Sequence, residues 1–316
     1  MQMVEHIIQM SGPRVSNGHR SPEAIGMILK WIEPTVRSSV SMAFQFASNP
    51  RGRRPEWLLA ASEIRFVDVS NGKETTDLRF EAPRLGDAAE ELYCQGELSG
   101  VRPDPHDTGF DLVGDMLRDI DLQARNSYRF DAQLLRRVEQ FAHATKWGIE
   151  WVTFHGDRLP EASPPRIDER ISVLALNLEK ETPLPLRARV AGRVDMIRVS
   201  DGTFSMILDS GETINGVLVA DATEVLKEYW NQRAVVEGTA VFRASGCLLR
   251  IEAEGIAKAS EADRFFSEMP KPAPAVLDLR SLRQPQTRSS GVGAVFGKWP
   301  GDETEGELLA ALKGKS

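Results

Sequence analysis

The sequence predicts an α+β protein, in which a mixed helix and strand domain is followed by a small β-barrel and a flexible C-terminal tail. Three observations predict this class. Helical and strand periodicities alternate before about residue 170, short strands with glycine turns follow, and after Met269 proline, serine and glycine replace the apolar pattern. The expected parts are an α+β domain over 1–170, a connecting strand or linker over 171–185, a barrel over 186–260, a linker over 261–294 and a partner-binding tail helix over 295–316.

The composition is that of a soluble globular protein with an acidic balance. Of 316 residues, 41% are hydrophobic and 27% are charged, and the net charge is −7. The apolar runs are far shorter than the roughly 20 residues that a membrane helix needs, and residues 1–14 lack the positive start of a signal peptide. Cys94 and Cys247 are too few for a disulfide framework and are expected to be buried and reduced. We therefore expect a cytoplasmic protein with no membrane partner.

The N-terminal domain is expected to begin with a helix. Ser21 can cap it, Pro22 suits its first position, and Pro34 is expected to interrupt it or to open a second helix. Two strands, joined by a turn at Asn71-Gly72, should follow. The last elements expected in this domain are three helices over 86–146 and a strand over 148–156.

Four aspartates, each four residues from the next, occupy one side of the helix expected near residues 107–120. Such a row could hold a divalent metal in a nuclease or phosphohydrolase. No histidine or second acidic motif accompanies the row, and an apolar stripe already explains the helix. We predict a solvated row with no metal, and we predict no catalytic residue and no cofactor in the chain. The four residues are Asp107, Asp111, Asp115 and Asp119.

Between residues 186 and 259 the pattern predicts three strands, a helix and two further strands. The turns are expected at Asp201-Gly202, Ser210-Gly211 and Ser245-Gly246, and the helix is expected to begin near Asp221. This order resembles the OB-fold, a five-stranded barrel with a helix between its third and fourth strands.

The OB-fold resemblance implies binding of single-stranded nucleic acid through aromatic and basic side chains. Residues 186–259 carry nine Lys and Arg against ten Asp and Glu, so their attraction for a phosphate backbone is weak. We expect the barrel to serve protein contacts or domain packing, and we keep a nucleic-acid-binding accessory protein as an alternative. The candidate residues for that alternative are Arg51, Arg53, Arg54, Arg193, Arg198, Phe204, Phe242 and Arg243.

The chain ends on VFGKWPGDETEGELLAALKGKS, residues 295–316. Asp302 and Glu305 fit a capping box, and three leucines form one face of a helix too short to be stable alone. Because a tryptophan and three leucines are costly to expose, we expect this segment to fold on a partner.

The segment FGKWPGDETEGELLAAL also resembles the C-terminal segments of VapB-like antitoxins, the partners of PIN-domain ribonuclease toxins. The resemblance covers only this segment and does not extend to a DNA-binding head. It implies a tail that wraps its toxin and blocks the acidic, metal-binding nuclease site. The sequence therefore predicts a non-enzymatic, antitoxin-like interaction protein. Its expected partner-binding residues are Trp299, Pro300, Asp302, Glu303, Leu308, Leu309 and Leu312.

Overall fold

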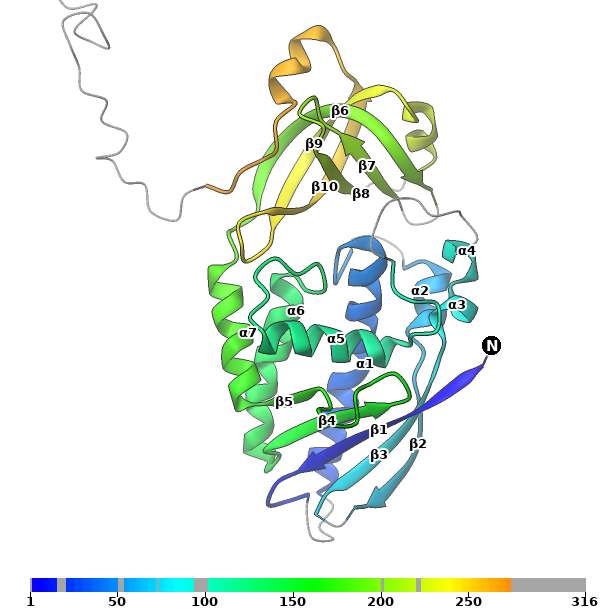
Figure 1. The fold of residues 1–316 in the computed structure, drawn as a ribbon, viewed down its shortest axis with the longest axis vertical. Helices are drawn as coiled ribbons and strands as arrows, with labels where there is room; N and C mark the ends of the chain where they lie inside the picture. The colour runs from blue at the N-terminus through cyan, green and yellow to red at the C-terminus, as the bar shows by residue number, and fades with distance from the viewer. Residues whose placement is uncertain are drawn as a thin grey trace, which may run out of the picture. The chain divides into compact units, whose positions relative to one another are not determined.

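The computed structural model describes residues 2–15, 21–50, 54–72, 74–93, 102–199, 202–219 and 223–273. Residues 1–273 form one compact unit, which contains a five-stranded sheet with helices and a closed five-stranded barrel (Figure 1). The predicted α+β class with a small barrel is confirmed. The partner-binding tail predicted over 295–316 lies outside the described residues. Within the described part of the chain, no helix is long and apolar enough to cross a membrane.

The sheet of the N-terminal domain has the strand order β2-β3-β1-β4-β5, and every pair is antiparallel. Its central strand was not predicted, and the expectation that order begins at Ser21 is wrong. Val4, Ile8 and Met10 alternate onto the buried face, so the first residues form a strand with a partner on each side. The strands are β1 Met3–Ser11, β2 Arg65–Asn71, β3 Thr76–Pro83, β4 Trp151–Gly156 and β5 Arg166–Asp168.

Helix α1 spans Pro22–Gln45 without a break. Ser21 caps it as predicted, but Pro34 lies inside it, so the predicted interruption is wrong. A proline removes one helical hydrogen bond, and here the buried side chains on both sides of Pro34 hold the helix together. The other helical segments of this domain are α2 Glu56–Ala61, α3 Leu85–Ala88, α4 Glu90–Tyr93, α5 Gly109–Asp121, α6 Ala132–Glu139, η1 Gln140–Trp147 and α7 Glu169–Glu181.

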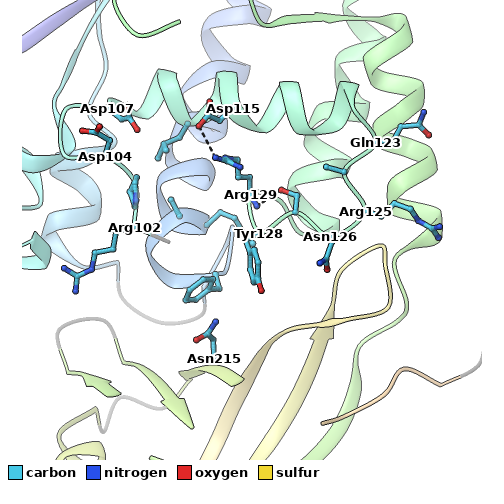
Figure 2. Close-up of a pocket in the computed structure, with 17 residues that line it drawn as sticks. Arg102, Asp104, Asp107, Asp115, Gln123, Arg125, Asn126, Tyr128, Arg129 and Asn215 are labelled. Atoms are coloured by element: carbon cyan, nitrogen blue, oxygen red, sulfur yellow. Dashed lines mark hydrogen bonds and ion pairs between the residues drawn. The ribbon is translucent and has the colours of Figure 1, made fainter. Parts of the chain in front are cut away.

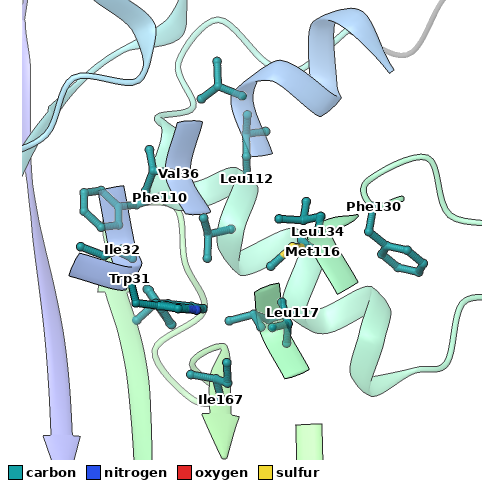
Figure 3. Packing of buried hydrophobic residues seen from close by; sticks show 14 of the residues in the cluster. Trp31, Ile32, Val36, Phe110, Leu112, Met116, Leu117, Phe130, Leu134 and Ile167 are labelled. Atoms are coloured by element: carbon teal, nitrogen blue, oxygen red, sulfur yellow. The ribbon is translucent and has the colours of Figure 1, made fainter. Parts of the chain in front are cut away.

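The core of this domain forms chiefly between α1 and α5. Trp31, Ile32 and Val36 of α1 are buried against apolar side chains of α5, as Figure 3 shows. Phe110 at the start of α5 also packs on Phe80 of β3, with ring centroids 5.6 Å apart. Helix α5 therefore connects α1 to the buried face of the sheet.

The segment 171–185, expected to be a connecting strand or linker, is mostly helical. Helix α7 fills it as far as Glu181, because the Asp168 side chain accepts a hydrogen bond from the Ile171 N–H and caps the helix. Ile171, Ala175 and Leu178 are buried at helical spacing. Only residues 182–185 connect this helix to the barrel.

The barrel has the strand order β10-β8-β7-β6-β9 and is closed. Strands β8 and β10 are parallel and all other pairs are antiparallel, with the helical segment η2 between the third and fourth strands. This arrangement is OB-like, as predicted; independent folding of the barrel stays a prediction. The elements are β6 Leu186–Arg198, β7 Thr203–Ile207, β8 Thr213–Leu218, η2 Thr223–Tyr229, β9 Arg233–Phe242, β10 Leu248–Lys258 and η3 Glu261–Phe266.

The barrel and the N-terminal domain share buried surface. The barrel encloses its own hydrophobic cluster, but Val241, Ala244 and Leu249 belong to the larger cluster that α1 and α5 also build. These three residues lie at the ends of β9 and β10 and in the turn between them. The barrel therefore packs on the N-terminal domain through its β9–β10 hairpin.

Candidate functional site: a cleft between the first domain and the barrel

A cavity of about 870 Å³ lies between the end of α1, the loop 122–131 after α5, and strand β8 (Figure 2). Ligand pockets typically have volumes of about 300–1,000 Å³ and are common at domain junctions. We call this cavity the junction cleft. Its apolar wall includes Met42, Phe46, Leu112 and Tyr128, and Asn215 lines it from the barrel.

Two residues of the junction cleft have a left-handed backbone. Phe46 has φ 56° and Gln123 has φ 51°, and among the described residues only Asn231 shares a positive φ without being glycine. Phe46 ends α1, where its N–H donates to the Met42 carbonyl over 3.0 Å. A left-handed backbone at a residue other than glycine costs roughly 1–3 kcal/mol of conformational energy, and such residues tend to occur at functional sites.

Tyr128 is the most exposed aromatic side chain of the cleft, at 43% exposure. The Arg243 guanidinium carbon lies 3.6 Å from the centre of its ring, and the Phe46 ring meets it edge-on with centroids 6.4 Å apart. A cation stacked on the ring and an aromatic neighbour at its edge restrict the orientation of the Tyr128 side chain.

Three arginines of the barrel donate hydrogen bonds to the segments of the first domain that line the cleft. Arg250 of β10 is buried, and it donates to the Phe46 carbonyl over 2.7 Å and to the Asp131 carboxylate over 3.3 Å. Arg198 of β6 donates to the Phe44 carbonyl over 3.4 Å. These bonds satisfy carbonyls at the C-terminal end of α1 that the helix itself leaves without partners.

Arg243 fixes the loop 122–131 in the same way. It donates to the Asn126 side-chain oxygen over 2.7 Å and to the Leu248 carbonyl over 2.9 Å. The Ser245 N–H in the β9–β10 turn donates to the Arg125 carbonyl over 2.9 Å. The loop that carries Tyr128 is therefore bonded directly to the β9–β10 hairpin of the barrel.

The charged groups at the α5 side of the cleft are paired. Arg158 contacts Asp104 over 2.8 Å and Asp107 over 2.5 Å, and Arg129 contacts Asp115 over 3.4 Å. Burial raises the pKa of Asp107, whereas the His106 N–H that bonds Asp104 lowers the pKa of that carboxyl. The arginines lining the cleft are balanced in number by aspartates: Arg102, Arg125 and Arg129 against Asp104, Asp107 and Asp115.

The aspartate row is not the solvated face that the sequence predicted. Asp111 is buried, and its carboxylate accepts bonds from the Thr108 N–H and hydroxyl in a capping box. Asp119 accepts from the Ser127 hydroxyl and pairs with Arg129. Across the described parts of the chain, no group of three or more His, Cys, Asp or Glu side chains is arranged to hold a metal ion.

A buried histidine lies beside that capping box. The Thr108 hydroxyl is 3.0 Å from Nε2 of His6, and the two ring systems of His6 and Phe110 are 4.8 Å apart. Burial lowers the pKa of His6 to about 4, so this imidazole is neutral at pH 7. The group is enclosed in the core and has a structural role.

The residues predicted for nucleic-acid binding do not form one patch. Phe204 and Phe242 lie inside the barrel, where they cannot stack on bases, and a Cβ on Gly216 would lie only 2.2 Å from the Phe204 ring. Arg198 and Arg243 are buried at the domain junction. Arg193 is exposed and donates to the Asn231 side-chain oxygen.

The other predicted candidates are separate from these or lie outside the described residues. Arg54 is exposed at a second cavity, of about 50 Å³, near the end of α1. Arg51, Arg53 and the seven partner-binding residues of the tail lie outside the described parts of the chain. Cys247 was expected to be buried, but the turn between β9 and β10 exposes it.

Sequence reasoning missed the cleft residues Phe46, Gln123, Tyr128 and Asn215. No spacing or motif connects them, because they come from the end of a helix, an irregular loop and a barrel strand. Comparison of the chain with family models, with curated proteins and with solved structures finds no match in any of the three.

Proposed function

We propose that this protein is a non-enzymatic, antitoxin-like interaction protein whose C-terminal tail binds and inhibits a PIN-domain ribonuclease. The observation that carries the proposal is the sequence of residues 295–316, where Trp299 and Pro300 precede an acidic turn and a leucine stripe. The resemblance to VapB-like antitoxins supplies the class of partner.

The residue types of the tail suit this role. A tryptophan is a common hot spot of protein interfaces, and a proline beside it lowers the entropy lost when the segment becomes ordered. Asp302, Glu303 and Glu305 lie at the start of the expected helix, where negative charge favours helix formation. The same acids can pair with basic residues along the RNA path of a ribonuclease and speed association.

The two hydrophobic clusters of the folded body, residues 1–273, are built from described residues that precede 274. A chain ending at residue 294 should therefore keep its fold, which makes a deletion of the tail a fair test. The full chain and the deletion variant would be titrated into a PIN-domain ribonuclease encoded beside this gene, with RNA cleavage as the readout.

The full chain is expected to abolish cleavage at stoichiometric concentration, and the variant lacking residues 295–316 is expected to leave cleavage unchanged. Circular dichroism and thermal unfolding would show that both proteins are folded. Inhibition of equal strength by the deletion variant would mean that the binding surface lies on the folded body, and the proposal would be wrong.

A second candidate is a nucleic-acid-binding accessory protein, which the OB-like topology of the barrel favours. Its surface would have to differ from the predicted one, because Phe204 and Phe242 are interior. Fluorescence anisotropy with single-stranded oligonucleotides at two salt concentrations tests it, since binding to phosphates weakens steeply as salt rises.

A further inference from the structure

The two faces of the Tyr128 ring have different surroundings. Tyr128 and Asn215 line both the junction cleft and a smaller neighbouring cavity of about 490 Å³. Arg243, which covers one face of the ring, lines the smaller cavity and not the cleft. The face of the ring away from that guanidinium is the one left for the cleft, which Phe46 also lines, its ring tilted 66° to that of Tyr128 with the centroids 6.4 Å apart.

One polar side chain points toward this aromatic surface. Asn215 projects from β8 toward Tyr128, as Figure 2 shows, and its carboxamide makes no hydrogen bond to another described side chain. Gln123 also lines the cleft, from the left-handed turn that follows α5, but Figure 2 shows its side chain pointing away from Tyr128. A carboxamide both donates and accepts hydrogen bonds, so it can pair with the edge of a heteroaromatic ring.

The charge of the cleft argues against a polyphosphate. Its three lining arginines are matched in number by three lining aspartates, and each of these aspartates is paired with an arginine, Asp104 and Asp107 with Arg158 and Asp115 with Arg129. A flat, uncharged group with a polar edge fits these surroundings better than an anion does.

We infer that the junction cleft binds a single nucleobase, stacked on the open face of Tyr128 and hydrogen-bonded at its edge by Asn215. The base can be supplied by a free nucleoside or by one unstacked nucleotide of a single strand. The residues of this site all precede 274, and the tail variants do not change them, so the inference and the proposed partner inhibition can fail independently of each other.

The test is calorimetric titration of the full chain with the four ribonucleosides, their 5′-monophosphates and a short single-stranded oligonucleotide. At least one nucleoside is expected to bind saturably at one site, and its 5′-monophosphate is expected to bind no tighter. Tighter, salt-sensitive binding of the oligonucleotide would identify a single strand as the source of the base, and equal binding would identify the free nucleoside.

Variants of Tyr128 and Asn215 test whether the base stacks on the tyrosine and is hydrogen-bonded by the asparagine. Tyr128→Leu is expected to weaken binding about tenfold or more, because a stacked base is lost, whereas Tyr128→Phe is expected to keep most of the affinity. Asn215→Ala is expected to weaken binding about fivefold and to reduce the preference among the four bases. Phe265→Ala, at an 87% exposed side chain of η3, is the matched control and should change nothing.

Several results would overturn the inference. One is the lack of saturable binding by all four nucleosides; another is unchanged affinity in a Tyr128→Leu protein that thermal unfolding shows to be folded. Equal binding of indole, which is flat but has one N–H donor and no hydrogen-bond acceptor, would also contradict it.

Discussion

At the scale of single residues, Arg250 joins the barrel to the N-terminal domain through buried contacts. Its side chain is 7% exposed and contacts the Phe46 carbonyl, Asp131 and Glu252. Asp131 also caps α6 and accepts from the backbone and hydroxyl of Ser48. Removing the arginine would leave that buried carboxylate without its cation.

We therefore expect Arg250→Ala to lower the free energy of unfolding by about 3 kcal/mol, since breaking a buried ion pair is strongly destabilising. The exposed Arg193 is the matched control, and Arg193→Ala should change stability by less than about 0.5 kcal/mol. Urea denaturation of both variants measures the difference. Equal effects of the two changes would show that the contacts of Arg250 carry little energy.

The burial of His6 leads to a second prediction at this scale, which concerns the free energy of unfolding at acid pH. Its pKa is lowered from 6.5 to about 4 by burial, so below pH 6.5 the unfolded chain binds a proton that the folded protein does not. This group therefore leaves the free energy of unfolding unchanged above pH 6.5. As the pH falls from 6.5 to 4, it lowers the free energy of unfolding by as much as about 3 kcal/mol. Asp111, whose pKa is raised by burial, acts in the opposite direction.

The measurement is the free energy of unfolding of the native protein and of His6→Gln at pH 7 and pH 4.5. The native protein should lose more stability between these two values than the variant does, even if the variant is less stable at both. Parallel losses in the two proteins would mean that His6 does not titrate as its burial requires.

At the scale of elements, closure of the barrel depends on close approach between β9 and β10. A Cβ on Gly238 would lie 2.1 Å from the Glu252 carbonyl oxygen, beside the irregularity between Ala253 and Gly255. Gly255, in the same hairpin, has open space at the corresponding position. Gly238 is thus buried and tightly enclosed, whereas Gly255 is exposed and has room around it.

Gly238→Ala is expected to lower the free energy of unfolding by about 1–3 kcal/mol, the usual cost of overpacking. Gly255→Ala should be neutral or slightly stabilising, because alanine reduces the freedom of the unfolded chain. Thermal unfolding of the two variants tests this pair. A Gly255→Ala protein as unstable as Gly238→Ala would contradict the packing argument.

Much of the element structure follows from local sequence. The glycine turns and alternating strands predict the barrel, and Ser21 with Pro22 predicts the start of α1. Phe204 alternates with Met206 and Leu208, a pattern that places it inside the barrel and that the prediction of a surface patch overlooked. The continuity of α1 through Pro34 depends on packing, which local propensity does not contain.

At the scale of the whole molecule, the junction cleft could not be predicted from the sequence. Phe46, Tyr128 and Asn215 are far apart in the chain and come together only when the barrel packs on the loop 122–131. The arginines that join the parts carry no local signal for this role. Arg198 donates to the Phe44 carbonyl and Arg243 to the Asn126 carbonyl, both in the first domain, although the charge of these arginines suggested a nucleic-acid surface.

The proposed function of the tail also concerns the whole molecule. It assigns partner binding to residues 295–316 and not to residues 1–273. The most direct measurement is the affinity of the full chain for the proposed partner, a PIN-domain ribonuclease, compared between Trp299→Ala and Trp230→Ala. Trp230 is a 65% exposed tryptophan of the body and is the matched control. We expect Trp299→Ala to weaken binding about thirtyfold through faster dissociation, as loss of a buried hot spot does, and Trp230→Ala to leave it unchanged. Unchanged affinity in Trp299→Ala would contradict the account.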